Sequence, residues 1–205
     1  HTQRRRQRQM CIRDSNYLSD LGRLRTVSGV ANTIPYYCFN SGLIILSAVF
    51  SFYFLFLPSL YDDNQRVQNL SRLGSICGLL ASICFAGVAY TPADLFFTAH
   101  KFFANWLYRL MNFTILFYAI SFLIMPKKHF TLSIVFGFVG VIVSSHIILS
   151  DFGLAEVFSE PHTVKVLSQK AATIALVISV PLMTIHNRGR IDSHPLILSP
   201  FAISK

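Results

Sequence analysis

Five long apolar runs, separated by short polar breaks, limit what this chain can fold into. A helix needs about 20 mostly apolar residues to cross the hydrocarbon core of a bilayer. Strands of a membrane barrel would instead alternate apolar and polar residues. The runs are solid, so the sequence predicts an all-α, polytopic transmembrane bundle. The predicted spans cover residues 39–60, 73–90, 105–125, 130–149 and 165–185.

The composition excludes other classes of protein. Only 13% of the residues are charged and 53% are hydrophobic, whereas a soluble domain has about 25% charged residues. So few charges cannot cover a globular surface, and disorder requires a much less hydrophobic chain. Four cysteines are too few to staple a secreted fold of this length.

The two ends of the chain differ from the apolar centre. Residues 1–15 contain RRRQRQMCIRDS, which resembles a translated sequencing adapter, and they supply five arginines and one aspartate to the net charge of +9. A basic arm could bind nucleic acid or anionic lipid, and no apolar stretch follows it as in a signal peptide. We interpret residues 1–15 as non-native and predict no nucleic-acid partner. Residues 16–190 form one predicted transmembrane domain, and residues 191–205 a loose tail.

Basic residues in the short loops predict the orientation, because cytoplasmic loops carry an excess of Lys and Arg. One side holds seven of them: Arg66, Arg72, Lys127, Lys128, Arg188, Arg190 and Lys205. The other side holds five, or six with Arg109: Arg23, Arg25, Lys101, Lys165 and Lys170. We therefore expect the C-terminus and the tight turn PKKH at 126–129 to be cytoplasmic, in the inner or plasma membrane of the cell.

Polar residues gather at the predicted outer side. Arg109 and His146 each lie about one turn inside the outer end of a span, and their distances from the PKKH turn place them at nearly the same depth. An ionisable residue at membrane depth is a functional candidate by default. We predict one outer-side polar cleft with an Asp–Arg or Asp–His contact, formed by Ser19, Asp20, Asp94, His100, Arg109 and His146.

Structural roles remain open for the same residues. The segment TPAD at 91–94 has the pattern of a helix start, and Ser19 with Asp20 could form a turn before Gly22. Arg109 could bind lipid phosphates at the interface, and His146 could make a hydrogen bond between helices. Catalytic fingerprints such as the P-loop, HExxH and the nucleophile elbow do not occur. The sequence therefore predicts no catalytic residue, no metal and no cofactor.

Three short motifs carry a family resemblance: NYLSDLG at 16–22, FNSGL at 39–43, and TPAD at 91–94 followed by His100. Together they resemble the domain-of-unknown-function 998 family, an uncharacterised family of prokaryotic multi-pass membrane proteins with a layout similar to the DRAM and Frag-type proteins. The match covers most of residues 16–186. The resemblance implies six spans, the first of which would precede residue 16 in the native chain. It implies no reaction.

The sequence favours an integral membrane protein that binds lipid, or a membrane-protein partner, without catalysis. One alternative is a small-solute carrier or channel subunit, with Asn105, Arg109 and Asn112 lining the path. Another is a metal-assisted membrane hydrolase with Asp and His ligands at the outer face, which would need three protein ligands and an open position.

Overall fold

The computed structural model describes residues 16–26, 28–61, 64–125 and 129–192. The described chain is helical and contains no strand, only an isolated bridge between Arg25 and Ala31. This confirms the all-α prediction. The adapter-like segment 1–15, most of the predicted tail and residues 126–128 of the PKKH turn lie outside the described residues.

Five of the described helices are long and apolar enough to cross a membrane, so the chain is a multi-pass membrane protein. Short helices connect or end them: the 3-10 helices η1, η2 and η4 and the final helix α7. In chain order the elements are η1 (Leu18–Gly22), α2 (Thr33–Phe56), η2 (Leu57–Leu60), α3 (Gln65–Tyr90), α4 (Phe97–Ile124), α5 (Phe130–Asp151), η4 (Leu154–Val157), α6 (Pro161–His186) and α7 (Arg188–Asp192).

Four of the five long helices begin earlier than the apolar runs predict. Helix α3 begins at Gln65, where the side chain of Asn64 accepts a hydrogen bond from the Arg66 amide at 2.8 Å and caps the first turn. Helix α4 begins at Phe97, about two turns before the predicted span. Apolar runs mark only the part of a helix that suits hydrocarbon, and these first turns carry polar residues.

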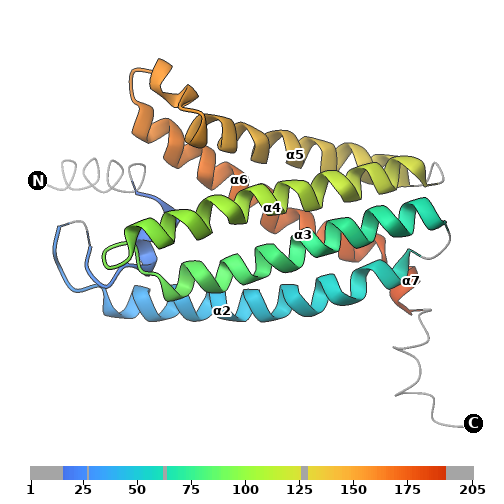
Figure 1. Cartoon of the computed structure of the whole chain (residues 1–205), viewed down its shortest axis with the longest axis horizontal. Coiled ribbons are helices and arrows are strands. Elements are labelled where there is room, and N and C mark those ends of the chain that lie inside the picture. Colours follow the sequence, from blue (N-terminus) through green and yellow to red (C-terminus); the bar gives the residue numbers. More distant parts are fainter. Residues whose placement is uncertain (1–15, 27, 62–63, 126–128, 193–205) are drawn as a thin grey trace, which may run out of the picture.

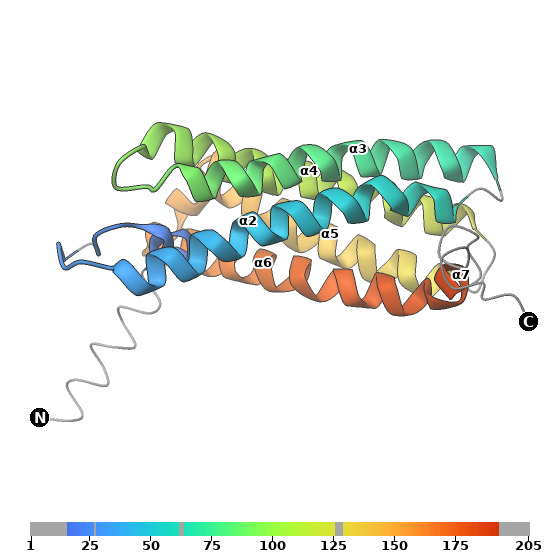
Figure 2. The same cartoon turned by 90° about the horizontal axis from the view of Figure 1, so that it is seen from below.

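The long helices run side by side along one axis (Figures 1 and 2). Each packs mainly against its neighbour in the chain: α2 on α3, α3 on α4, α4 on α5, and α5 on α6. One end of the bundle carries η1, η4 and the α3–α4 connection, and we call it the η1 end. The opposite end carries η2 and α7, and we call it the α7 end (Figure 1).

The half of the bundle nearer the α7 end has a tightly packed core. Tyr118 and Phe122 of α4 are almost completely buried with Tyr61. The Tyr118 hydroxyl pairs with Ser75 Oγ at 2.7 Å and donates to the Ser71 carbonyl oxygen at 3.1 Å. Glycine allows the close approach, since a Cβ at Gly74 would lie 3.0 Å from the Tyr118 ring. Small residues support such packing where lipid gives helices no hydrophobic drive to associate.

Polar contacts also close the α7 end. The Asn187 side-chain amide donates to the Tyr61 hydroxyl at 2.5 Å, and Arg190 donates to the Leu60 carbonyl oxygen at 2.7 Å. These bonds join α7 and the residue before it to η2 and the residue after it. Burial raises the pKa of Tyr61 above that of an ordinary phenol.

Candidate functional site

A cavity of about 570 Å³ opens at the η1 end. Its walls come from the segment around η1, the start of α4, the end of α5 and the start of α6. The apolar α7 half lies beneath it. Four of the six residues predicted to form the outer cleft line this cavity: Ser19, Asp20, His100 and His146.

The η1 segment is tied to two helices and so forms a fixed wall. The Leu18 amide donates to Gln169 Oε1 of α6 at 3.1 Å, and Asn40 of α2 donates to the Gly22 carbonyl oxygen at 3.2 Å. A Cβ at Gly22 would lie 2.8 Å from Asn40 Oδ1, so glycine permits this contact. The Asp20 carboxylate accepts from the Tyr17 amide at 2.8 Å and from Arg23 at 3.2 Å.

Two buried histidines face this cavity, each with one ring nitrogen held by the protein. His100 Nδ1 lies 2.6 Å from the Thr91 carbonyl oxygen. His146 Nδ1 lies 2.9 Å from Ser168 Oγ, whose hydroxyl donates to the Lys165 carbonyl oxygen. Each histidine is 6% exposed. His100 Nε2 is buried without a hydrogen-bond partner, which is uncommon for a polar atom in a folded interior.

Arg109 does not line this cavity, and its partner is not Asp20. Its Nη2 and Nε atoms donate to Asp151 Oδ2 at 2.7 and 3.0 Å. Its guanidinium carbon lies 5.3 Å from the centre of the Trp106 ring. The predicted cleft includes Asp20 and Asp94 as possible partners, but the end of α5 supplies the carboxylate because α4 and α5 run side by side.

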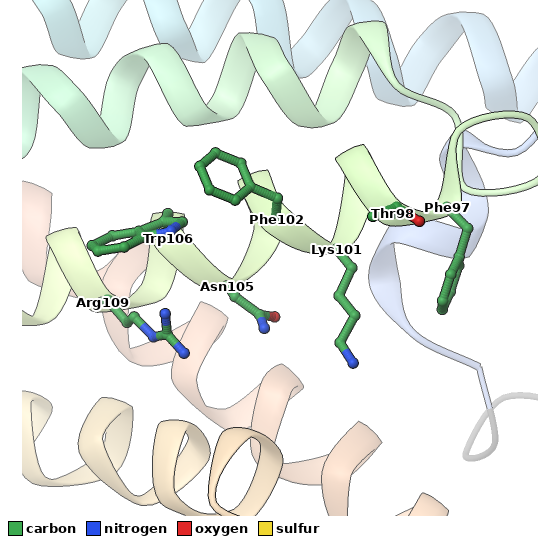
Figure 3. A pocket seen from close by; sticks show the side chains of 7 residues that line it. All are labelled: Phe97, Thr98, Lys101, Phe102, Asn105, Trp106 and Arg109. Atoms are coloured by element: carbon green, nitrogen blue, oxygen red, sulfur yellow. The ribbon is translucent and has the colours of Figure 1, made fainter.

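Helix α4 carries a second, shallower pocket of about 280 Å³ next to the cavity. In Figure 3 the side chains of Lys101, Asn105 and Arg109 project from one side of α4 and Phe102 from the other, and Trp106 also lines the pocket. We call these three residues the polar stripe: their spacing of four places them on one face of the helix, and Asn105 and Arg109 also belong to the path of the carrier alternative. Lys101 and Asn105 line the cavity as well, so the stripe joins the two hollows.

Asp94 also lies outside the cavity lining, and the predicted helix start at 91–94 is wrong. Thr91 closes α3, since its amide and hydroxyl donate to the Gly87 carbonyl oxygen, and α4 begins only at Phe97. The Asp94 carboxylate accepts from the amides of Leu24 and Arg25 at 3.3 and 3.0 Å. Asp94 therefore holds the loop after η1 against the α3–α4 connection.

No hydrogen bond or ion pair of the described chain joins an Asp of the six cleft residues to an Arg or His among them, but the Asp20 carboxylate interacts electrostatically with His100. Asp20 pairs with Arg23, and Arg109 pairs with Asp151. The relative register of α4 and α5 is nevertheless close to the expected one. Tyr108 precedes Arg109 in the sequence, and the centres of the Tyr108 and His146 rings are 4.6 Å apart in an edge-to-face contact.

Several lining residues were not predicted. Their side chains come from the η1 segment and from the first turns of α6, where sequence patterns are short. Spacing of three and four could have grouped His162, Lys165 and Gln169 on one face of α6. The missed residues include Tyr17, Arg23, His162, Lys165 and Gln169.

The charges around the cavity are predominantly positive. Arg23, Lys101 and Lys165 line it, against the single carboxylate of Asp20. Lys165 Nζ lies 2.6 Å from Glu156 at the rim, whereas Lys101 has no charged partner in the part of the chain that the structure describes. Burial raises the pKa of the Tyr17 phenol.

An apolar pocket of about 230 Å³ adjoins the polar cavity. The two share the lining residues Ser19, Ala104, Tyr108 and Gln169. The remaining lining residues are mostly apolar and come mainly from α2, α3, α4 and α6. They include Leu43, Phe50, Phe85, Met111 and Leu176. Direct contact between α2 and α6 is sparse in the described chain, so the pocket lies at a thinly packed seam of the bundle.

No protein-family model, curated protein or solved structure matches the chain. Among the described residues, no three His, Cys, Asp or Glu side chains are grouped closely enough to hold a metal ion.

Proposed function

We propose that the protein binds a membrane lipid at the η1 end without catalysing a reaction. The headgroup would occupy the polar cavity, and part of an acyl chain would occupy the adjoining apolar pocket. One observation carries the proposal: a hollow rich in cations and hydrogen-bonding groups shares its wall with an apolar hollow. An amphiphilic ligand needs this combination, a mostly apolar site with a few well-placed polar groups.

The charges favour a headgroup that contains phosphate. Arg23, Lys101 and Lys165 offer donors to a phosphate oxygen, and hydrogen bonds between charged groups are about twice as strong as neutral ones. Lys101 is the most available of the three, because Arg23 and Lys165 already contact carboxylates. The packed core around Tyr118 and Phe122 favours a site open at one end over a path across the membrane for a small solute.

Lipid binding can be tested by filling the shared wall. Ala104 lines both hollows, so Ala104→Phe should weaken binding of phosphatidylglycerol at least tenfold, measured by native mass spectrometry of the detergent-purified protein. Ala48→Phe makes the same change on the exposed side of α2 and should leave the affinity unchanged. Equal affinities in both variants and the unmodified protein would contradict the proposal.

We further propose that the η1 end faces away from the cytoplasm of a prokaryotic cell and that the C-terminus is cytoplasmic. The charge bias of the loops supports this orientation. In a cysteine-free background, a cysteine at position 156 should react with an impermeant thiol reagent in whole cells. A cysteine at position 128 should react only after the cells are opened. The reverse pattern would overturn the orientation.

Membership in the domain-of-unknown-function 998 family, with a sixth helix before residue 16, and a membrane-protein partner both stay predictions. The family proposal depends on the three motifs quoted above. Two of them form parts of the cavity wall: NYLSDLG contains η1, and His100 follows TPAD. The full-length gene would test the family proposal through the presence or absence of an apolar segment before residue 16.

A further inference from the structure

The two buried histidines of the polar cavity share a hydrogen-bonding pattern. The Thr91 carbonyl oxygen can only accept, so His100 Nδ1 must carry the proton. With the Ser168 hydroxyl donating to the Lys165 carbonyl oxygen, the tautomer that fits has His146 Nδ1 donating to Ser168 Oγ. In the neutral imidazole the other nitrogen then has a lone pair. Both histidines therefore present Nε2 as an acceptor.

Neither acceptor is used by the protein. His100 Nε2 is buried without a hydrogen-bond partner. His146 Nε2 is not one of the fully buried atoms, and its residue has a hydrogen bond only through Nδ1 in the described chain. Both residues line the cavity and are about nineteen-twentieths buried. At His100, the buried acceptor without a donor costs about 1–3 kcal/mol, and a ligand that supplies a donor removes this cost.

The cavity thus combines two kinds of polar group at one site. Cationic side chains suit a phosphate, which has only acceptors, and the histidine Nε2 atoms need a donor. A glycerol headgroup supplies hydroxyl donors and an ethanolamine headgroup supplies N–H donors. A choline headgroup supplies neither. Because the charged lining is net positive, a glycerol headgroup meets less repulsion than an ammonium group.

We propose that His100 and His146 select, among phospholipids, those whose headgroup donates a hydrogen bond beyond the phosphate. The inference depends on the lipid-binding function proposed above and specifies its ligand. We expect phosphatidylglycerol to bind most tightly and phosphatidylethanolamine next. Phosphatidylcholine, which lacks the donor, should bind about threefold to tenfold more weakly than phosphatidylethanolamine, the effect of one lost hydrogen bond.

A methylation series tests the inference with the unmodified protein. Phosphatidylethanolamine and its monomethyl, dimethyl and trimethyl forms keep the phosphate and the net charge but carry three, two, one and no N–H donors. With identical acyl chains, native mass spectrometry should show affinity falling most at the last methylation, where the final donor is lost. A steady decline with headgroup size, or equal affinities, would overturn the inference.

Matched variants locate the effect. Asparagine can place its amide N–H near the position of Nδ1 while lacking Nε2, so His100→Asn with His146→Asn should bind phosphatidylethanolamine and phosphatidylcholine equally. His129→Asn makes the same change at the α7 end and should keep the preference. Retained preference in the double variant would contradict the inference.

The outcomes also distinguish the two proposals. If all lipids bind with equal affinity but Ala104→Phe still weakens their binding, the inference fails and the lipid-binding proposal stands. If Ala104→Phe weakens none of them, both fail.

Discussion

The two halves of the bundle are built from the same helices but differ in how they fill their interior. Near the α7 end, Tyr61, Tyr118 and Phe122 are packed together, and the Tyr118 hydroxyl has two partners. Near the η1 end, the interior contains a cavity, and His100 Nε2 is buried without a hydrogen-bond partner. Helix α4 passes through both halves, with Phe122 in the packed one and Lys101 in the hollow one.

This difference separates stability from binding. Full packing and satisfied hydrogen bonds stabilise a fold, whereas a cavity with unused acceptors costs stability and is retained where it has a use. Substitutions in the α7 half should therefore change the free energy of unfolding and leave lipid affinity of the folded protein unchanged. Substitutions in the cavity wall should mainly change affinity.

The largest expected effect is the loss of a core aromatic side chain. Phe122 is 0% exposed, so Phe122→Ala should lower the free energy of unfolding by about 3–5 kcal/mol through lost contacts and a new cavity. Phe138→Ala on α5, where the side chain is 66% exposed, should cost less than about 1 kcal/mol because lipid replaces the ring. Unfolding in mixed micelles with increasing sodium dodecyl sulfate measures both. Similar costs would show that the α7 half is not the rigid one.

A smaller effect should follow from breaking the ion pair that joins α4 to α5. Asp151→Asn weakens the contact with Arg109, and we expect a loss of about 1–2 kcal/mol. The value is reduced because the Arg109 side chain is 35% exposed and so is partly screened. Asp192→Asn breaks the exposed pair with Arg188, whose atoms are 3.8 Å apart, and should change stability very little. A larger loss at Asp192 than at Asp151 would contradict this assignment.

The smallest predicted effect concerns one hydroxyl in the packed half. Tyr118→Phe removes the hydrogen bonds to Ser75 and Ser71 and should cost about 1 kcal/mol. The exposed Tyr37→Phe on α2 should be neutral. Neither change should alter phosphatidylglycerol binding, and altered binding by the folded Tyr118→Phe protein would show that the two halves are coupled.

The sequence predicts the packed half better than the hollow one. Apolar runs and small residues are enough to predict helices and their close contact. The spacing of Arg109 and His146 from the PKKH turn is enough to compare their depth. Periodicity cannot choose between carboxylates at one level, so the predicted cleft includes Asp20 and Asp94 but omits Asp151, which is the partner of Arg109. The role of Asp94 depends on amides about seventy residues away, which no local pattern reveals.

Photochemical crosslinking tests the central claim most directly. A phosphatidylglycerol with a diazirine in one acyl chain is bound to the purified protein and irradiated, and the adducts are located by mass spectrometry. We predict adducts on the apolar pocket residues Leu43, Met111 and Leu176 that disappear in Ala104→Phe. Adducts confined to the exposed faces, such as Phe138 of α5, and unchanged in that variant would contradict a lipid site at the η1 end.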